Sequence, residues 1–485
     1  MLFVIKEAGE IPLKSARTRP RFEKRLVKAI RTALARNGIE ATVKISHGIL
    51  YVEAHDSAKE VLRKVFGIHS VCAAIPYKFS GLEDIAEKAV EIFSDAVKGK
   101  KFAVRVKRAG KHDFTSMDVA RVVGAALLPH SAGVDLSNPD VVVKIEVRGG
   151  TAYFIVDCVK GSGGLPVGTG GRGLALHSGG FDSTASAWLA AKRGLEIDFL
   201  HLYMGSVENS VRAARIAHRL GREWFSPHDP RMILIDVTPL TAWIRLFVRP
   251  DLRQVVLRVV MHEIAQSVAA RHGYDAVIAG EAVGQASSQT LQNLRVVDSL
   301  VKNRYALVLR PVSCFDKEEV VELVRTIGLY EEVEKVREVC KIAEGPQATR
   351  AKASQVAEEL SKVPQDVVKD AANKAVVVDP SNEAEVRKAL KSFDEGITVN
   401  EIGENAVPLD ARSRREFMEW HVPGAVHIED VIRGGPLEKP VVVYCWYGTL
   451  SRGIAKALRA LGIEAYALTK PVSELRLEHE LRKGR

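Results

Sequence analysis

The chain has 485 residues and a mass of 53.1 kDa, a length that predicts about three domains and allows a fourth. Hydrophobic residues make up 46% and charged residues 27%, a globular composition that excludes a mainly disordered protein. The net charge of +10 is concentrated near the N-terminus, where residues 1–50 carry 11 basic and 4 acidic side chains. This excess favours a polyanionic partner such as nucleic acid, with a solvated surface as the alternative.

Two features of the sequence predict a cytoplasmic protein. Charge appears after five residues in MLFVIKEAGEIPLK, which argues against a secretory signal, and no apolar run reaches the ~20 residues of a membrane-spanning helix. The cysteines form no CxxC motif and no close framework, which predicts a reducing setting without disulfide or structural zinc. They stand at Cys72, Cys158, Cys314, Cys340 and Cys445.

The first third of the chain predicts two small α+β units. Residues 1–67 follow the order strand, helix, strand, strand, helix, with an amphipathic helix ending at Gly38. Residues 81–157 give helix, strand and helix, followed by two strands around the turn Arg148-Gly149-Gly150. This pattern is typical of α+β sandwiches.

A glycine-rich segment, GSGGLPVGTGGRG (161–173), predicts a shaped loop between domains. Its GxGxxG precedes a strand, whereas a dinucleotide fingerprint follows one and opens a helix. From Leu174 onward apolar strands alternate with helices, which predicts a parallel α/β domain. Residues 361–400 are expected to be a polar helical connector, and residues 405–485 a second, smaller α/β unit.

The segment LALHSGGFDSTASAWLAAKRG (174–194) carries the most chemical information. An apolar strand leads into Ser178, Gly179 and Gly180, and a helix follows. Small residues let the backbone close around an anion, while the helix N-terminus supplies N–H groups and a positive dipole end. No GxxxxGK[ST] is present, so this is not a loop for γ-phosphate transfer. Ser178 and Ser183 are expected to bind phosphate oxygens.

Two charged residues complete the expected nucleotide site. A carboxylate beside triphosphate requires a bridging cation, so Asp182 is predicted to be a Mg²⁺-linked or catalytic acid. Lys317 opens a helix, where a cation is unusual, and it either faces a ligand anion or is solvated. The loop GEAVGQASSQTLQNL (280–294) is expected to contact nucleotide or substrate.

These residues resemble those of the tRNA 4-thiouridine synthetase family, whose PP-loop motif is SGGxDS. The resemblance covers nearly the whole chain and includes GGLPVGTGGRGLALHSGGFDS, GEAVGQASSQTLQNL and EVCKIAEGPQATRAKAS (338–354). It implies a multidomain α/β protein with an N-terminal ferredoxin-like α+β domain, an RNA-binding THUMP domain, a Rossmann-like PP-loop ATP pyrophosphatase domain and a rhodanese-like domain. The expected boundaries are 1–58, 59–163, 164–395 and 396–485.

The resemblance implies the roles of individual residues. Asp182 and Lys317 match residues needed for adenylation. The expected contacts to ATP are Leu176, His177, Ser178, Gly179, Gly180, Ser183, His201, Leu202, Arg258, Gly280 and Gln289. For His177 and His201, buried packing is the alternative reading. The pattern predicts no protein-only metal site, because the HExxH-like run at His262 has Gln266 in place of the second histidine.

Two cysteines are predicted to be catalytic. Cys445 follows the strand VVVY and precedes a helix, whose N–H groups stabilise a thiolate, and its loop is similar to the rhodanese active loop. Cys340 by itself reads as a packed thiol, but the resemblance implies that it forms a disulfide with Cys445 after sulfur leaves. Cys72, Cys158 and Cys314 are expected to be packing residues.

The resemblance implies an ATP-dependent tRNA sulfurtransferase that adenylates a uridine, expected at position 8, and replaces O4 with sulfur from a Cys445 persulfide. It implies tRNA and a cysteine desulfurase as partners, with ATP and Mg²⁺ as cofactors and no membrane. Basic candidates for the RNA are Arg105, Lys107, Arg108 and Lys111. Two alternatives stay open: a sulfur donor for the thiamine thiazole that acts with a sulfur carrier protein, and an RNA-binding protein with a weak catalytic core. Family members often form homodimers, and the oligomeric state is left open.

Overall fold

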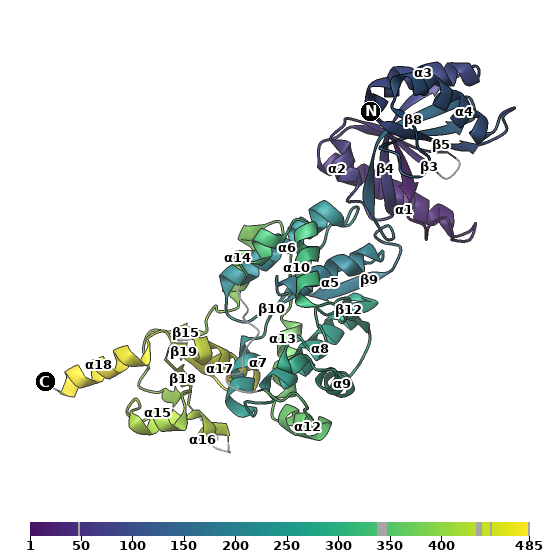
Figure 1. The fold of residues 1–485 in the computed structure, drawn as a ribbon. Helices are drawn as coiled ribbons and strands as arrows, with labels where there is room; N and C mark the ends of the chain where they lie inside the picture. Colours follow the sequence, from purple (N-terminus) through teal and green to yellow (C-terminus); the bar gives the residue numbers. More distant parts are fainter. Residues whose placement is uncertain (47–48, 337–346, 433–438, 447–448, 484–485) are drawn as a thin grey trace. The chain divides into compact units, whose positions relative to one another are not determined.

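The computed structural model describes residues 1–485 apart from 47–48, 337–346, 433–438, 447–448 and 484–485 (Figure 1). The chain divides into two compact units. The first is Met1–Gly170 with Lys192–Gly194 and Arg222–Pro227, and the second is Gly171–Ala191, Leu195–Gly221 and His228–Arg485. Across the described residues, no helix combines the length and the apolar character that a bilayer crossing requires.

The first unit is built on an eight-stranded sheet with the strand order β2-β3-β1-β4-β8-β7-β5-β6. Its strands pair antiparallel, except that β5 runs parallel to both β6 and β7. The elements are β1 (Leu2–Glu7), α1 (Arg19–Arg36), β2 (Ala41–Ser46), β3 (Ile49–Ala54), α2 (Ala58–Leu62), β4 (Ile68–Lys78), α3 (Leu82–Val97), β5 (Lys101–Ala109), α4 (Ser116–Leu127), β6 (Gly133–Val134), β7 (Val141–Arg148) and β8 (Thr151–Gly163).

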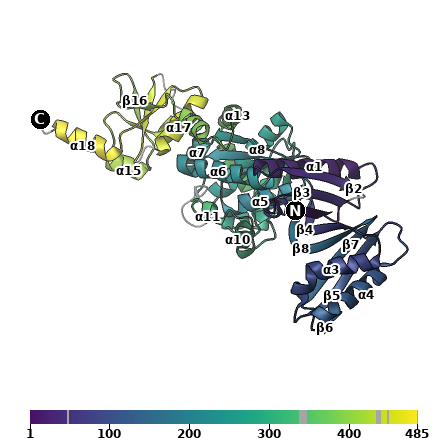
Figure 2. The same cartoon turned by 90° about the horizontal axis from the view of Figure 1, so that it is seen from above.

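Each half of this sheet has its own helical cover. Helix α1 starts with Pro20 in its first turn, and it buries an apolar stripe from Phe22 to Leu34 against β1 and its neighbours, leaving its basic residues on the other face. Helices α3 and α4 pack beside each other over β5 and β7 (Figure 2). A capping box between Thr115 and Asp118 starts α4. The order of elements expected for both small units is therefore confirmed, apart from the short strand β6, which was not expected.

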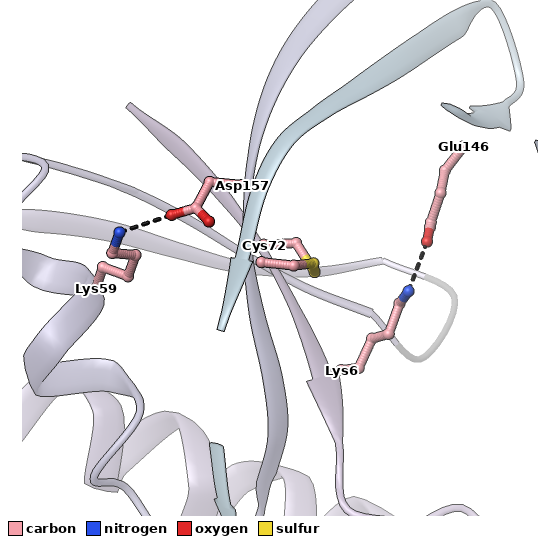
Figure 3. The surroundings of a disulfide bond; sticks show 6 residues. Lys6, Lys59, Cys72, Glu146 and Asp157 are labelled. Carbon is pink, nitrogen blue, oxygen red and sulfur yellow. Dashed lines mark hydrogen bonds and ion pairs between the residues drawn. A yellow bond between two sulfur atoms is a disulfide. The ribbon is translucent and has the colours of Figure 1, made fainter. Parts of the chain in front are cut away.

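Two predictions were wrong: that the chain has no structural disulfide, and that Cys72 and Cys158 are only packing residues. They face each other on the antiparallel strands β4 and β8, and they form a disulfide with Cα atoms 4.1 Å apart (Figure 3). Two ion pairs lie nearby and involve strands of the same sheet: Lys59 of α2 with Asp157 of β8 at 2.6 Å, and Lys6 of β1 with Glu146 of β7 at 2.9 Å. Sequence spacing did not suggest this bond, because only the strand register brings residues 86 apart into contact.

The second unit begins with a six-stranded sheet in the order β13-β12-β9-β10-β11-β14. Its elements are β9 (Arg172–Leu176), α5 (Phe181–Lys192), β10 (Glu196–Tyr203), α6 (Val207–Trp224), β11 (Met232–Asp236), α7 (Thr238–Phe247), α8 (Arg253–His272), β12 (Ala276–Ile278), α9 (Leu291–Leu300), β13 (Leu307–Leu309), α10 (Lys317–Thr326), α11 (Tyr330–Val333), α12 (Ala353–Ser361), α13 (Gln365–Asn373), β14 (Val376–Val378) and α14 (Glu383–Ser392).

The topology of this sheet has a switch point between β9 and β12. The chain winds from β9 through β10 to β11 on one side, then returns through α8 to place β12 on the other side of β9, with all these strands parallel. Because parallel crossovers are right-handed, the reversal puts α5 and α8 on opposite faces, and sheets of this kind bind ligands at the carboxyl ends of the strands on either side of the switch point. Both expected nucleotide loops, after Leu176 and after Ile278, begin at this edge.

Three details of this domain differ from the sequence prediction. The expected polar connector contains strand β14, which pairs antiparallel with β11 and so makes the sheet mixed rather than purely parallel. Helix α7 was not expected, and helix α9 begins at Leu291 inside the segment expected to be a loop. The three valines of β14 give too short an apolar run to stand out between polar helices.

The last part of the second unit is a five-stranded parallel sheet in the order β15-β19-β18-β16-β17. Its elements are β15 (Thr398–Val399), β16 (Val407–Asp410), α15 (Arg414–Glu419), β17 (Val426–His427), α16 (Ile428–Ile432), β18 (Val441–Tyr444), α17 (Thr449–Ala460), β19 (Ala465–Leu468) and α18 (Val472–Lys483). Helix α17 packs on α7: a Cβ at Gly453 would lie 2.5 Å from the carbonyl oxygen of Thr238. Lys456 forms ion pairs of 2.6 Å with both Asp236 and Asp394.

Candidate active site

The SGGFDS segment forms a tight turn between β9 and α5. The hydroxyl of Ser183 donates to the carbonyl oxygen of Gly180 at 3.0 Å, and the amide of Gly180 donates to Ser178 Oγ at 3.2 Å. Gly179 has a φ of +82°, and a Cβ there would meet Ala213 Cα at 3.1 Å, so this position requires glycine. Both serines thus shape the turn that was predicted to bind phosphate.

Gly280 is the point where the second loop touches this turn. A Cβ at position 280 would lie 2.6 Å from the backbone nitrogen of Ser183 and 2.7 Å from the carbonyl carbon of Asp182. The segment after β12 therefore approaches the N-terminus of α5 with backbone against backbone. This contact brings two segments about 100 residues apart in sequence together at the carboxyl edge of the sheet, at the switch point between β9 and β12.

Asp182 lies where three segments converge. Its Oδ2 accepts a hydrogen bond from Gln285 Nε2 at 2.9 Å, and its Oδ1 lies 3.7 Å from Lys317 Nζ. The Lys317 ammonium also lies over the ring of Phe181, 5.3 Å from its centroid. Lys317 is the first residue of α10, and Asp316 and Glu319 form a capping box around it. The negative charge of these two side chains offsets the unfavourable position of a cation at a helix N-terminus. Sequence reasoning placed Asp182 and Lys317 at the site but missed Gln285.

The two histidines after β9 and within β10 are buried and form one chain of hydrogen bonds. His177 Nε2 donates to the carbonyl oxygen of Ala213 at 3.1 Å. His201 Nδ1 donates to the carbonyl oxygen of His177 at 2.8 Å, so its Nε2 accepts from the Ser210 hydroxyl at 2.8 Å when the ring is neutral. Burial, with a smaller contribution from His201, lowers the pKa of His177 to about 3. Both rings hold the turn as neutral groups.

The remaining expected nucleotide contacts lie in two places: Gln289 and Arg258 at the segment from Gly280 to Gln289, and Leu176 and Leu202 on the neighbouring strands β9 and β10. Gln289 Oε1 accepts from the amide of Ala282 at 2.9 Å. Arg258 reaches the same segment from α8, donating from Nη1 to Glu281 at 2.7 Å and from Nε to Ser288 Oγ at 3.3 Å. Leu202 is buried in β10, and Leu176 is the last residue of β9, which places both at this sheet.

Cys445 follows β18 directly and is 5% exposed. Its Sγ accepts a hydrogen bond from the backbone N–H of Ser451, in the first turn of α17, at 3.4 Å. The neighbouring Trp446 donates from its indole nitrogen to Glu416 Oε1 at 2.6 Å, and the Arg412 guanidinium lies 5.2 Å from its ring centroid. Cys445 thus sits at a helix N-terminus as expected. Cys340, its predicted partner, lies outside the described residues.

The four basic candidates for RNA contact lie on β5 and the turn that follows it, and all are exposed. Arg105 donates to the carbonyl oxygen of Leu136 at 2.6 Å, and Arg108 to that of Gly110 at 3.2 Å. These bonds fix the two guanidinium groups at the surface of the half of the first unit that α3 and α4 cover, called here the THUMP-like half.

Four family models match the chain in sequence order: the ThiI ferredoxin-like domain over residues 3–72, the THUMP domain over 79–157, the thiamine biosynthesis protein (ThiI) over 168–364 and the rhodanese-like domain over 398–475. The chain is 43% identical to a tRNA sulfurtransferase of Desulfurococcus amylolyticus over 96% of each chain. It is 35% identical to one of Pyrobaculum aerophilum over 97% of each.

A crystal structure of a 4-thiouridine synthetase–RNA complex with bound ATP is also similar. The two are 28% identical with a TM-score of 0.68, and the match covers 78% of this chain and 98% of the other. Together with the sheets described above, these matches confirm the expected fold class: ferredoxin-like, THUMP, PP-loop and rhodanese-like domains in one chain.

Proposed function

Because the chain belongs to the tRNA sulfurtransferase family, we propose that it makes 4-thiouridine, expected at position 8 of tRNA, from ATP and a protein-bound sulfur. The observation that carries this proposal is the convergence of Asp182, Gln285 and Lys317 beside the backbone contact of Gly280 with the start of α5. A site of this shape suits a triphosphate whose pyrophosphate must leave.

In the first half-reaction the uridine O4 attacks the α-phosphorus of ATP. A bond forms between O4 and the α-phosphorus, the bond to the bridging α,β-oxygen breaks, and pyrophosphate leaves with that electron pair. The N3 proton of the base is lost to water as a C4–N3 double bond forms, and N3 is protonated again when the thiolated base is released. The turn from Ser178 to Gly180 and the N-terminus of α5 hold the phosphates through N–H groups. The positive charge of Lys317 stabilises the negative charge that develops on the leaving pyrophosphate. The neutral side chain of His177 keeps the turn in place.

The residues present also fit a Mg²⁺ ion. Asp182 Oδ1 is buried, and among the described residues it accepts no hydrogen bond, with Lys317 as its only charged neighbour, at 3.7 Å. An oxygen of this kind is a hard ligand that an ion bridging to phosphate can use. When bound, the ion would neutralise charge on the phosphates, and Asp182 would hold it.

In the second half-reaction sulfur replaces the activated oxygen. A cysteine desulfurase loads Cys445 with a persulfide, whose terminal sulfur attacks C4 of the base while AMP leaves with the former O4. In the sulfide route the Cys340 thiolate first attacks Cys445 Sγ, which breaks the persulfide S–S bond, forms the Cys340–Cys445 disulfide and releases the sulfide that attacks C4. In the direct route the Cys340 thiolate then attacks Cys445 Sγ, which breaks the S–S bond to the base, leaves 4-thiouridine and forms a Cys340–Cys445 disulfide. A dithiol reductant must supply two electrons to reopen it.

The first unit is the proposed tRNA-binding part. Its exposed Arg105, Lys107, Arg108 and Lys111 would meet phosphates of the RNA backbone, and recognition by shape needs no base contact. We place the reaction in the cytoplasm, where tRNA and a desulfurase are available. A homodimer is compatible with this scheme, and the reaction as written needs one chain.

A second function has one observation in its favour. The family model over residues 168–364 is described as a thiamine biosynthesis protein, so the same Cys445 persulfide could pass sulfur to a thiazole-pathway sulfur carrier protein. Replacing Arg105 and Lys107 by Glu in the full chain distinguishes the two. tRNA thiolation should fall, and sulfur transfer to a carrier protein should persist. A catalytically weak RNA-binding protein would instead release no pyrophosphate with tRNA and ATP.

The test is nucleoside analysis of tRNA after incubation with ATP, Mg²⁺, cysteine and a desulfurase. The wild type should produce 4-thiouridine, whereas Cys445→Ser and Cys340→Ser should not turn over. Cys314→Ser is the matched control, because Cys314 is an exposed free cysteine that the scheme does not use. Continued 4-thiouridine formation by Cys445→Ser, with cysteine as the only sulfur source, would remove Cys445 from the mechanism.

A further inference from the structure

Glu281 is a buried carboxylate that none of the sequence predictions used. It follows Gly280 at the end of β12 and is 4% exposed. Its Oε1 accepts from Arg258 Nη1 at 2.7 Å and from His262 Nε2 at 3.3 Å, and its Oε2 accepts from Arg310 Nε at 2.7 Å. Burial by itself would raise the pKa of Glu281, but His262, Arg258 and Arg310 together outweigh it and hold the pKa well below its usual range. The group is therefore a carboxylate at every working pH.

The partners of Glu281 come from three different elements. Arg258 and His262 stand four residues apart on α8, so they share one face of that helix, while Arg310 follows β13. Arg310 also binds Asp298 of α9 with an N–O distance of 2.6 Å. One carboxylate thus joins α8 and the end of β13 to the loop that contains Gly280, and through Arg310 it reaches α9.

Arg258 depends on Glu281 for its orientation. Its Nη1 is held by Glu281 and its Nε by Ser288 Oγ at 3.3 Å, so both bonds point the guanidinium along the segment from Gly280 to Gln289. Arginine has five N–H donors in a rigid fork, so fixing two of them sets the direction of the others. With the carboxylate gone, the two partly buried guanidinium groups would lose their shared acceptor and would repel each other.

Glu281 also determines where Gly280 lies. The two residues are neighbours in sequence, and Gly280 is packed against the backbone of Asp182 and Ser183 with no room for a methyl group. A shift of the Glu281 side chain would therefore move the backbone that abuts the phosphate turn. Rigid placement of this kind is the usual task of groups behind a binding site.

We propose that Glu281 is a positioning residue of the ATP site: it holds Arg258 in the orientation in which this guanidinium meets ATP, and it keeps Gly280 against the start of α5. The inference rests on the proposed function, because it presumes that ATP binds at the switch point between β9 and β12. Glu281 does not touch the nucleotide itself. It acts on ATP binding through Arg258, and its effect should appear in KM rather than in kcat.

The test measures tRNA-dependent pyrophosphate release by the full chain as a function of ATP concentration. Glu281→Gln keeps the shape but turns an NH₂ group toward the guanidinium groups, so KM for ATP should rise by about 10- to 100-fold with kcat nearly unchanged. Glu281→Asp keeps the charge and should recover most of the loss. Asp298→Asn is the matched control, since Asp298 binds Arg310 from a more exposed position, and its KM should equal that of the wild type.

A double-mutant cycle separates positioning from simple structural support. If Glu281 acts through Arg258, then Glu281→Gln should add no further rise in KM in an Arg258→Ala background. A KM unchanged in Glu281→Gln, with only a lower melting temperature, overturns the inference. If that variant does not fold, Arg258→Ala decides, because the inference requires this guanidinium at the ATP site, and a KM for ATP equal to the wild-type value in Arg258→Ala overturns the inference. A wild type that releases no pyrophosphate contradicts the proposed function instead.

Discussion

Lys317 and Asp182, 135 residues apart in sequence, face each other at the carboxyl edge of the PP-loop sheet, with 3.7 Å between Nζ and Oδ1. The distance is longer than a direct hydrogen bond, so neither group uses its hydrogen-bonding capacity on the other. The ammonium is about half exposed, whereas the carboxylate is mostly covered. This arrangement leaves both charges available to a ligand that carries phosphate and a cation.

The first prediction concerns this pair. Replacing Asp182 by Ala or Lys317 by Ala should each lower kcat for pyrophosphate release by about 100-fold or more, because each removes a charge next to the leaving group. Stability should change little, since the pair is partly exposed. Steady-state kinetics with tRNA and ATP provide the measurement. Glu318→Ala, an exposed neighbour on α10, is the control and should retain full activity.

The second prediction concerns Gly280. An alanine there would place its methyl group 2.6 Å from the backbone nitrogen of Ser183, and the start of α5 has to move to accommodate it. A displacement near 1 Å at the reacting groups can cost about 100-fold in rate, and we expect kcat/KM for ATP to fall by that order. Gly403→Ala, where the added methyl meets no atom within 4 Å, should have no effect. Equal activity of the two variants would contradict the proposed backbone contact.

The third prediction concerns the Cys72–Cys158 disulfide. The bond closes a loop of 86 residues that contains most of the THUMP-like half, and loop-closure entropy gives it about 4 kcal/mol of stabilisation. Calorimetry of the full chain should show the transition of the first unit at a lower temperature after Cys158→Ser, or in the presence of a strong reductant. Cys314→Ser should leave this transition in place. If reductant shifts the Cys158→Ser protein as much as the wild type, the disulfide does not carry the effect.

The fourth prediction concerns Glu7 in β1, which is 8% exposed. Burial, reinforced by Glu23 and opposed by Arg19, raises the pKa of Glu7 to about 7. The folded state therefore favours the protonated carboxyl, and this contribution is complete below about pH 4.5 and is lost as the pH rises to about 7. Glu7→Gln imitates the protonated form.

Hydrogen exchange of the β1 amides in the full chain tests this expectation. At pH 8 the Glu7→Gln protein should be protected more strongly than the wild type, by about 3 kcal/mol, and at pH 4.5 the two should be equal. Glu60→Gln, an exposed carboxylate on α2, should show no such pH dependence. Equal protection at both pH values would mean that Glu7 is not destabilised as a carboxylate.

Local sequence was sufficient for the features that a single segment encodes. The turn from Ser178 to Ser183 was predicted because strand, small residues and helix follow each other directly. The same holds for Cys445 between β18 and α17 and for the amphipathic helix α1. In each case the pattern of side chains and the local backbone impose the same structure.

Features that depend on distant segments could not be predicted in this way. Gln285 and Glu281 gain their roles from Asp182 and Arg258, which only the topology of the sheet brings near them. The Cys72–Cys158 bond depends on the register of β4 and β8, and one step of slippage would turn the two side chains to opposite faces. Short strands such as β14 are selected by the edge of the sheet they join rather than by their own propensity.

The Cys72–Cys158 bond gives the chain two opposite chemical requirements. If sulfur transfer ends in a Cys340–Cys445 disulfide, each turnover needs electrons delivered to one cysteine pair while the bond in the first unit has to survive the same reductant. Burial of Cys72, 1% exposed, shields one of the two sulfurs from attack, whereas Cys158 is open to solvent. The protein that regenerates the enzyme must therefore discriminate between two disulfides of a single polypeptide, so docking, and not reducing power alone, has to govern which bond it opens.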